Sequence, residues 1–308
     1  MKIVKLYPHK NAKFHFGYLG LDINDYIFHS DSLFSCLVIN HIRKCGESNI
    51  DYFVRNFPKI TSLFYGIKSN GKDVLFFPFY LNFKLPEKLK SDRKIRKKIK
   101  MVSLGAIKNS SAIKTNNSKS LIYLDNEGDD IKLFYEDVEE KVSIDKTTSL
   151  AEEGKLYSVS YIRLENDVFF FFIIDGELSD DLKDSIYMIK NFGIGGEISN
   201  GAGQIERIEI EDFDGFNDMN QNSSNYVNLS VVFPSKDDYG KLHSYKLIER
   251  KGWVYFDSKR KSNIIGLSEG SLFKGNVKGE IREEKLNEKV IYRFGKAFTI
   301  PVVIDDEN

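Results

Sequence analysis

The 308-residue sequence contains only two cysteines, Cys36 and Cys45, and five histidines. Both cysteines fall in or next to one predicted helix, which argues against a disulfide and fits a reduced, cytoplasmic protein. Two cysteines and five dispersed histidines do not form a four-ligand zinc cluster. No apolar run approaches the length of a membrane span, and the first ten residues lack the apolar core of a signal peptide. We therefore expect a cytoplasmic protein without bound metal, cofactor or membrane contact.

Proline is also scarce, with six residues, whereas phenylalanine and tyrosine number 24 and 16. Aromatic side chains pack well on pleated surfaces, so this composition favours β-sheets. The net charge of zero averages over segments of opposite sign. Residues 84–119 carry 12 Lys and Arg against two acidic residues, and residues 125–153 carry 11 acidic residues against three Lys. Separated charges of this kind can hold a polyanion on one surface and a protein on another, although plain solvated faces explain them as well.

The periodicity of the first two thirds of the chain predicts the order strand–helix–strand–strand–helix–strand. Ser30 is the expected N-cap of the first helix, with Asp31 in its first turn, and Ser179 caps the second helix. Four consecutive phenylalanines, Phe169 to Phe172, predict a strand buried on both faces. This order is that of a ferredoxin-like, RRM-like domain. Further strands are expected at residues 2–7, 74–77, 101–104, 121–123, 131–135, 155–164 and 204–210.

The domain organisation follows from shifts in composition. We expect an α+β fold with an N-terminal ferredoxin-like domain over residues 1–214 and a linker over residues 215–225. A smaller α+β domain, a degenerate ferredoxin-like copy, is expected over residues 226–308. The N-terminal domain carries an insertion at about residues 84–155. Its basic part, residues 84–119, is too polar for a core and predicts a loop or an excursion away from the sheet.

Five glycines lie within residues 193–203. A dinucleotide-binding fingerprint fails because Ile198 stands where a glycine is required, and a P-loop fails because Ala202 and Gly203 replace its Lys and Ser/Thr. Both motifs also need a strand before the loop and a helix after it, whereas here a helix precedes and a strand follows. Two interpretations remain: a bare backbone that an extended polyanion can approach, and a sharply turned loop without a ligand. Five glycines exceed what one turn requires, which favours the polyanion.

Residues 142–159 resemble a hairpin arm with a hydroxyl-rich tip. Hydroxyl groups and a lysine at such a tip suit contacts with sugar and phosphate, and a solvated loop fits the composition equally well. The tip consists of Asp145, Lys146, Thr147, Thr148 and Ser149.

Candidate catalytic residues are few. A metal-independent ribonuclease needs a base near the attacked 2′-hydroxyl, and His15 and His29 are the candidates. Each is adjacent to phenylalanine, which is more typical of a structural histidine, and His41 falls on the apolar stripe of the first helix. We therefore expect no enzyme activity. The alternative is a metal-independent endoribonuclease that uses His15 or His29.

Eight segments matter by their order, and they begin at His15, His29, Val142, Glu152, Gly193, Arg260, Glu269 and Tyr292. Taken in this order they resemble the RAMP superfamily, and specifically subunit four of the type III-A CRISPR effector complex. The resemblance spans nearly the whole chain, and the order of the segments is more specific than the glycine-rich loop alone. Lys146 stands where arginine is commoner and Ser32 where threonine is, and both changes keep the chemistry.

The resemblance implies two ferredoxin-like domains with a thumb hairpin, and capping of the 5′ repeat-derived tag of the guide RNA. It also implies contacts with the large polymerase-like Cas subunit and with the neighbouring backbone RAMP subunit, without RNA cleavage by this chain. The alternative within the superfamily is a metal-independent RAMP-type endoribonuclease that processes precursor guide RNA with His15 or His29. The residues expected to bind the RNA are Ser30, Asp31, Ser32, Ser35, Ile144, Asp145, Lys146, Thr147, Gly193, Gly195, Gly196, Ser199, Asn200, Gly201, Gly203, Arg260, Lys261 and Arg293.

Overall fold

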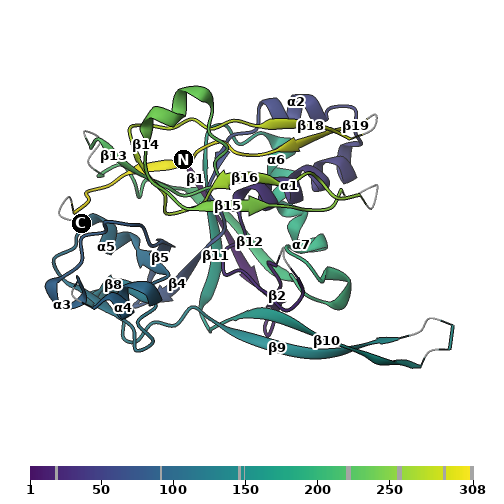
Figure 1. The fold of residues 1–308 in the computed structure, drawn as a ribbon, viewed down its shortest axis with the longest axis horizontal. Helices are drawn as coiled ribbons and strands as arrows, with labels where there is room; N and C mark the ends of the chain where they lie inside the picture. The colour runs from purple at the N-terminus through teal and green to yellow at the C-terminus, as the bar shows by residue number, and fades with distance from the viewer. Residues whose placement is uncertain are drawn as a thin grey trace.

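A nine-stranded sheet occupies the centre of the computed structural model, which describes residues 1–17, 20–90, 92–144, 147–148, 150–219, 223–254, 259–286 and 289–305. Its strand order is β12-β1-β11-β4-β5-β6-β8-β7, and β3 pairs with β11 beside this path (Figure 1). The strands are β1 (Lys2–Pro8), β3 (Lys59–Ile60), β4 (Phe64–Ser69), β5 (Lys72–Pro78), β6 (Met101–Ser103), β7 (Ile113–Thr115), β8 (Leu121–Leu124), β11 (Val168–Asp175) and β12 (Ile205–Asp212).

Strand β11 lies between β1 and β4 and pairs antiparallel with both. All four phenylalanines from Phe169 to Phe172 are fully buried, so side chains that point to both faces of the sheet are covered. This confirms the prediction of a central strand covered on both sides.

Four helices belong to this sheet: α1 (Ser30–Cys45), α2 (Ile50–Arg55), α6 (Asp180–Tyr187) and α7 (Ile189–Phe192). Helix α1 follows β1, and α6 lies between β11 and β12, so the chain has the predicted order of strands and helices. Helices α1 and α6 pack against each other. Helix α1 ends at Cys45 and is capped by Gly46, which has a φ of +73° and donates its N–H to the carbonyl oxygen of Ile42. None of the helices in the described ranges is long and apolar enough to cross a membrane.

The basic segment of residues 84–119 extends the central sheet. Strand β6 pairs with β5, and Met101 and Val102 are fully buried. The strand predicted at residues 101–104 is therefore confirmed, and the expectation of a loop or an excursion away from the sheet was wrong. Isolated apolar residues such as Ile95 and Ile99 reach the core, while the lysines between them keep their charged ends at the surface. The segment also contains α3 (Glu87–Lys90), α4 (Arg93–Lys98), α5 (Leu104–Lys108) and β7, and η1 (Asp125–Glu127) follows it.

A long hairpin projects from one end of the sheet (Figure 1). It consists of β9 (Phe134–Ile144) and β10 (Ala151–Leu164), and β2 (Lys13–Phe14) pairs with the base of β10. We call this hairpin the thumb. It begins earlier than the arm predicted at residues 142–159. Of its predicted tip, Asp145, Lys146 and Ser149 lie outside the described residues.

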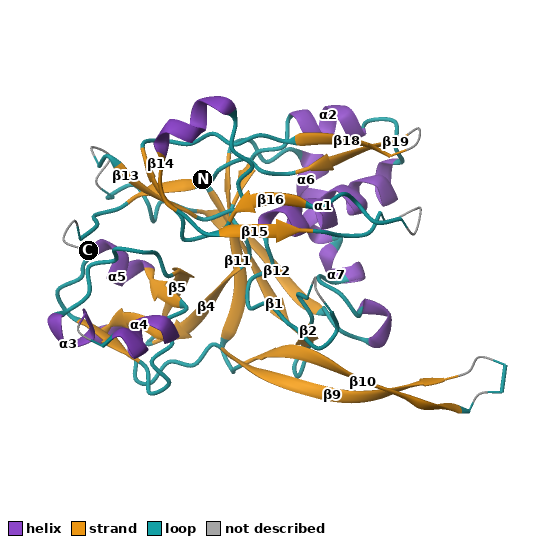
Figure 2. Ribbon diagram, viewed as in Figure 1, coloured by secondary structure: helices purple, strands orange, loops and turns teal. Residues whose placement is uncertain are grey.

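The C-terminal part contains a four-stranded sheet of order β14-β17-β13-β20 and two hairpins, β15–β16 and β18–β19 (Figure 2). From residue 223 onward the described residues form one 3₁₀ helix, η3 (Lys236–Lys241), and no α-helix. The expected α+β copy of the first domain was wrong in this respect. The strands are β13 (Asn225–Asn228), β14 (Leu242–Ser244), β15 (Leu247–Arg250), β16 (Ile264–Leu267), β17 (Leu272–Lys274), β18 (Arg282–Leu286), β19 (Lys289–Arg293) and β20 (Thr299–Pro301).

The two parts of the chain share one hydrophobic core. Phe294 stacks on Phe34 of α1 with ring centroids 5.0 Å apart, and both side chains are buried. Phe298 also packs in the cluster that contains β11. The C-terminal hairpins are therefore held at fixed positions over the start of α1.

Candidate functional site

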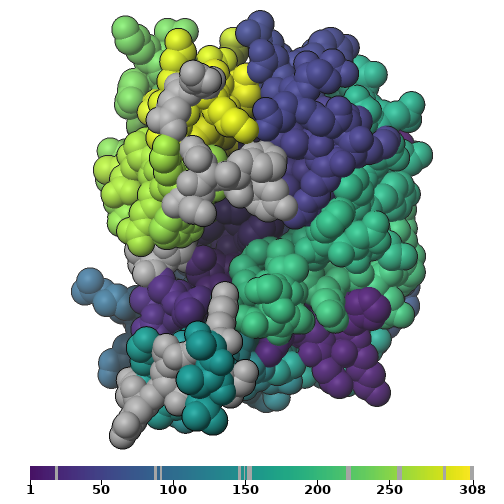
Figure 3. Space-filling view, turned by 90° about the vertical axis from the view of Figure 1, so that its right-hand side faces the viewer, coloured from purple at the N-terminus to yellow at the C-terminus, as the bar shows by residue number. Residues whose placement is uncertain are grey.

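An open groove of about 800 Å³ lies between the first half of α1, the glycine-rich loop after α7 and the loop of the β15–β16 hairpin. Figure 3 shows it as a hollow between the green glycine-rich loop and the yellow-green C-terminal hairpin. Nine residues predicted to bind RNA line it, although they come from four distant parts of the sequence. These are Asp31, Ser32, Ser35, Gly193, Gly195, Gly196, Arg260, Lys261 and Arg293.

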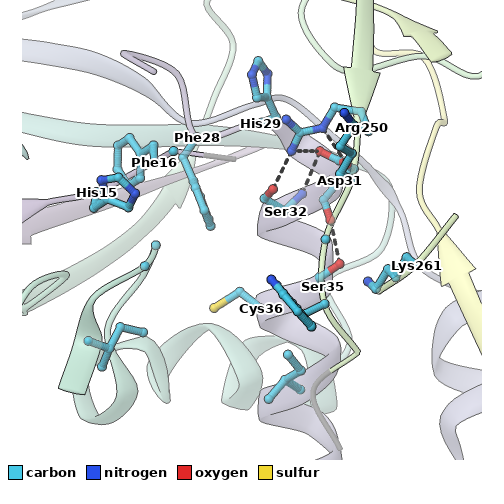
Figure 4. Close-up of a pocket in the computed structure, with 18 of the residues that line it drawn as sticks. His15, Phe16, Phe28, His29, Asp31, Ser32, Ser35, Cys36, Arg250 and Lys261 are labelled. Atoms are coloured by element: carbon cyan, nitrogen blue, oxygen red, sulfur yellow. Dashed lines mark hydrogen bonds and ion pairs between the residues drawn. The ribbon is translucent and has the colours of Figure 1, made fainter. Parts of the chain in front are cut away.

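Arg250 joins the C-terminal hairpin to the first turn of α1. Its Nε donates to one carboxylate oxygen of Asp31 at 2.9 Å, and a terminal nitrogen lies 2.9 Å from the other oxygen. The same nitrogen donates to the Ser32 hydroxyl at 2.7 Å (Figure 4). Burial would raise the pKa of Asp31, but the positive charge of Arg250 holds it below the usual range. The Asp31 carboxylate is therefore ionised and occupied by this pair.

Ser30 does not cap α1, which corrects the prediction. The N-cap is His29, and its side chain makes no capping hydrogen bond. The Ser30 hydroxyl instead accepts the backbone N–H of Val231 at 2.8 Å. Ser30 is fully buried, so it fixes the C-terminal part against α1 and does not line the groove.

His29 lies between two carboxylates beneath the groove. Its Nδ1 is 2.9 Å from Glu269 and its Nε2 is 3.1 Å from Asp25. Burial alone would lower the pKa of His29, but the charge of Glu269 and the hydrogen bonds to both carboxylates raise it to about 9. Protonated His29 donates at both nitrogens, which makes it a structural cation and a poor base near neutral pH.

The wall of the groove opposite the glycine-rich loop is cationic. Arg293 donates to the backbone carbonyl groups of Arg250 at 3.2 Å and Ser262 at 2.6 Å. Burial lowers the pKa of Lys261, and the positive charge of Arg293 lowers it further. Across the described chain, no residue forms a salt bridge or hydrogen bond with the Lys261 ammonium group. Lys261 therefore offers a positive charge that an anion entering the groove can neutralise.

The sequence analysis missed two aromatic side chains at the rim. Trp253 is 61% exposed, and the Arg260 guanidinium lies 4.8 Å from the centroid of its ring. Arg43 covers the ring of Phe192 in the same way at 3.9 Å. An exposed tryptophan beside arginine provides a surface on which a nucleobase can stack. The clue in the sequence was that this is the only tryptophan.

The glycine-rich loop owes most of its glycines to contacts inside the protein. Gly195 has a φ of +88°, and a Cβ there would lie 2.6 Å from the carbonyl oxygen of His15. Gly203 has a φ of +80°, and its Cβ would lie 2.3 Å from the carbonyl oxygen of Ile194. The argument that five glycines exceed structural needs was therefore wrong. Gly196 differs, because its φ is not positive and it lines the groove.

The base of the thumb supports this loop. Gly196 donates its N–H to the carbonyl of His15 at 2.8 Å, next to β2. Ala202 packs against Val159 and Tyr161 of β10, and Lys141 lies 3.7 Å from Glu197. The loop, β2 and the thumb base therefore form one continuous unit at the edge of the groove.

The other predicted residues do not line the groove. Ile144 is 61% exposed on the distal thumb, and Thr147 belongs to the tip beyond it. Ser199 and Asn200 lie in η2 (Ile198–Asn200) on the exposed side of the glycine-rich loop, followed by exposed Gly201. Gly203 is buried. Within one chain the thumb tip and the groove are thus two separate surfaces, because the length of the thumb separates them.

His15 is the histidine that best fits the alternative function. It is buried at the groove, and its Nδ1 donates to the carbonyl oxygen of Ser160 at 2.9 Å. A carbonyl can only accept, so Nε2 is the nitrogen left to act as a base when the ring is neutral. No carboxylate contacts the ring among the described residues, in contrast to His29.

Comparisons of the sequence with known proteins identify relatives over its full length. Residues 221–302 match the family described as the CRISPR Csm4 C-terminal domain. The chain is 32% identical to the CRISPR system protein Csm4 of Methanocaldococcus jannaschii, over 98% of this chain and 97% of that protein.

Two solved structures share the fold. One is a crystal structure of a Csm3–Csm4 subcomplex of the type III-A CRISPR-Cas interference complex, with a TM-score of 0.73, 28% identity and coverage of 98% of this chain and 100% of that chain. The other is a Csm1–Csm4 cassette with AMPPNP, with a TM-score of 0.61, 16% identity and coverage of 99% and 98%. Together with the similarity over the full length, these matches show that the chain belongs to the Csm4 family of CRISPR proteins.

Proposed function

We propose that this chain is a non-catalytic subunit of a type III-A CRISPR complex, and that its groove holds the 5′ repeat-derived tag of the guide RNA. The observation that carries this proposal is the groove itself. It gathers nine of the residues expected to bind RNA around an unpaired lysine, a bare glycine backbone and an exposed tryptophan. A single-stranded RNA needs these features: cations for its phosphates, room for its backbone, and a surface for stacking.

The proposal assigns different roles to the groove residues. Lys261 and Arg260 contact phosphates, Trp253 stacks on a base, and Gly196 allows the RNA backbone to come close. Asp31 and Arg250 act as positioning residues, because their mutual ion pair fixes the α1 start against the C-terminal hairpin. Arg293 has the same role, since one of its terminal nitrogens donates to two backbone carbonyls.

We further propose that the chain joins the large polymerase-like subunit to the neighbouring backbone RAMP subunit, in cytoplasmic complexes. The Csm4 proteins of the two solved structures were crystallised with Csm3 and with Csm1. The thumb offers a contact surface, because its exposed apolar side chains project away from the core. These side chains are Val138, Ile144, Leu150 and Leu156, each at least 60% exposed. The groove proposed to bind RNA and the thumb surface proposed to bind protein then lie on different parts of the molecule.

The proposed RNA site is tested with the complex reconstituted from its subunits and an RNA that copies the 5′ end of the copurifying guide. Lys261→Gln and Arg260→Gln should each weaken binding several-fold. Each should also reduce the slope of log K against log salt by about 0.7, the value for one phosphate of a single strand. Lys274→Gln is the matched control, since Lys274 is exposed on β17 away from the groove. Unchanged affinity and salt slope in both groove variants would exclude the groove as the RNA site.

A further inference from the structure

We propose that His41, Cys45 and Asp181 bind a zinc-type divalent ion where the end of α1 meets the start of α6. One imidazole nitrogen, the thiol sulfur and one carboxylate oxygen of these residues all lie within 4.8 Å of one another. None of the three lines the groove. The proposal is therefore independent of the proposed RNA-binding function.

Helix geometry explains how the three ligands meet. His41 and Cys45 are four residues apart on α1, so they lie on one face of the helix, one turn apart. Asp181 lies in the first turn of α6, which packs against α1. The sequence analysis looked for a four-ligand cluster of cysteine and histidine, and it therefore did not consider an aspartate contributed by another helix.

His41 supplies a second, independent observation. Its side chain is 1% exposed, and neither ring nitrogen has a hydrogen-bond partner in the part of the chain that the structure describes. The ring stacks on Phe53 with centroids 4.0 Å apart, which fixes its plane. A buried imidazole normally satisfies both nitrogens, so an unpaired one that faces a thiol and a carboxylate indicates a ligand.

The donor set suits zinc. Nitrogen, sulfur and oxygen donors are its usual protein ligands, and they are about 2.0–2.3 Å from the metal in a tetrahedral arrangement. Three such donors are about 3.3–3.8 Å apart, so small rotations of exposed Asp181 and half-buried Cys45 complete the site. Water takes the fourth position, because two of the ligands reach the surface.

The charged groups around the site do not oppose this assignment. Lys44 lies next to Cys45 on α1, and it forms an ion pair with Asp184 of α6. The carboxylate of Asp181 therefore remains for the ion. Bound metal would add a further link between the same two helices and stabilise the layer to which α1 belongs.

Cobalt(II) added to the purified full-length chain is the direct probe, because tetrahedral cobalt bound to a thiolate absorbs in the near ultraviolet and the visible. We expect one equivalent of cobalt to give these bands in the wild type. Cys45→Ser should abolish the thiolate band, and Asp181→Asn should weaken cobalt binding at least tenfold. Cys36→Ser is the matched control on the same helix, and it should keep the band because burial raises the pKa of the Cys36 thiol to about 12. Both test substitutions are at sites that reach the surface, so folding is preserved.

Thermal unfolding gives a second readout. Excess zinc should raise the Tm of the wild type and of Cys36→Ser, and it should leave the Tm of Cys45→Ser unchanged. Absence of a thiolate band in the wild type at several-fold excess cobalt would overturn the proposal. A band that survives Cys45→Ser, or cobalt affinity unchanged by Asp181→Asn, would overturn it as well.

Discussion

Arg250 and Asp31 form a two-point ion pair that links the C-terminal hairpin to the start of α1. The two contacts are both 2.9 Å, and the residues are 219 positions apart in the sequence. Only 4% of the Arg250 side chain and 15% of the Asp31 side chain are exposed. The pair therefore determines where the cationic loop of β15–β16 lies relative to the glycine-rich loop across the groove.

Removing one partner of this pair should strongly destabilise the folded chain. In Asp31→Ala, a buried guanidinium loses its counter-ion, and we expect unfolding free energy to fall by about 3–5 kcal/mol. Urea unfolding of the purified chain measures this. Glu249→Ala is the control, because its pair with Lys251 is more exposed and should contribute about 0–1 kcal/mol. A loss below about 1 kcal/mol in Asp31→Ala would show that the pair does not hold the groove together.

Stability should fall as the pH rises through the titration of His29. Its pKa is raised from 6.5 to about 9 in the folded chain, so the folded state binds the proton more tightly than the unfolded state. The stabilisation is complete below about pH 6.5 and is lost as the pH rises through about 9, a change on the order of 3 kcal/mol. Urea unfolding from pH 6 to 10 should show this fall. Glu269→Gln removes the main anionic partner of His29 and should therefore flatten the dependence of unfolding free energy on pH. If the variant keeps the slope of the wild type, other groups cause the effect.

The elements that the sequence predicted correctly are those with a strong local pattern. The run from Phe169 to Phe172 and the apolar stripe of α1 bury surface in one obvious way. The resemblance located the groove residues Lys261 and Arg293, because short motifs keep their order. Arg250 and Trp253 escaped prediction, since their roles depend on a hairpin folding back onto α1. Tertiary contacts of that kind leave no periodic pattern.

The glycine-rich loop shows a different limit of sequence reasoning. Gly195 and Gly203 are required by positive φ and by close backbone contacts, which look the same in the sequence as a ligand-binding loop. Likewise, the average polarity of residues 84–119 predicted a segment away from the sheet, although the strand predicted at residues 101–104 is β6 and lies in the sheet. In both cases the composition marked the segment as unusual, but only the three-dimensional contacts show why the residues are there.

Gly196 and Gly201 should respond differently to substitution. Leucine at Gly196 places a side chain in the groove, so we expect RNA affinity to fall at least tenfold while the chain stays folded; the His15 ring, 3.0 Å from the new Cβ, must shift slightly. Leucine at Gly201 meets no atom within 4 Å, but φ there is +79°, so it should cost about 1–2 kcal/mol of stability. Because Gly201 does not line the groove, its RNA affinity should be unchanged. RNA titrations and urea unfolding of both variants test this. If both variants bind RNA with the wild-type affinity, the loop has a structural role only.

The last prediction is that the chain alone does not cleave RNA. General base catalysis needs a group near the 2′-hydroxyl with a pKa near the working pH. His29 fails because its pKa is raised to about 9, and Asp31 fails because Arg250 lowers its pKa and occupies both oxygens. His15, with Nε2 left as an acceptor, is therefore the residue on which the alternative function depends. Labelled repeat RNA should stay intact with the purified chain in EDTA and with added Mg²⁺. Specific cleavage that is present in the wild type and in His29→Gln, but absent in His15→Gln, would establish a metal-independent endoribonuclease instead.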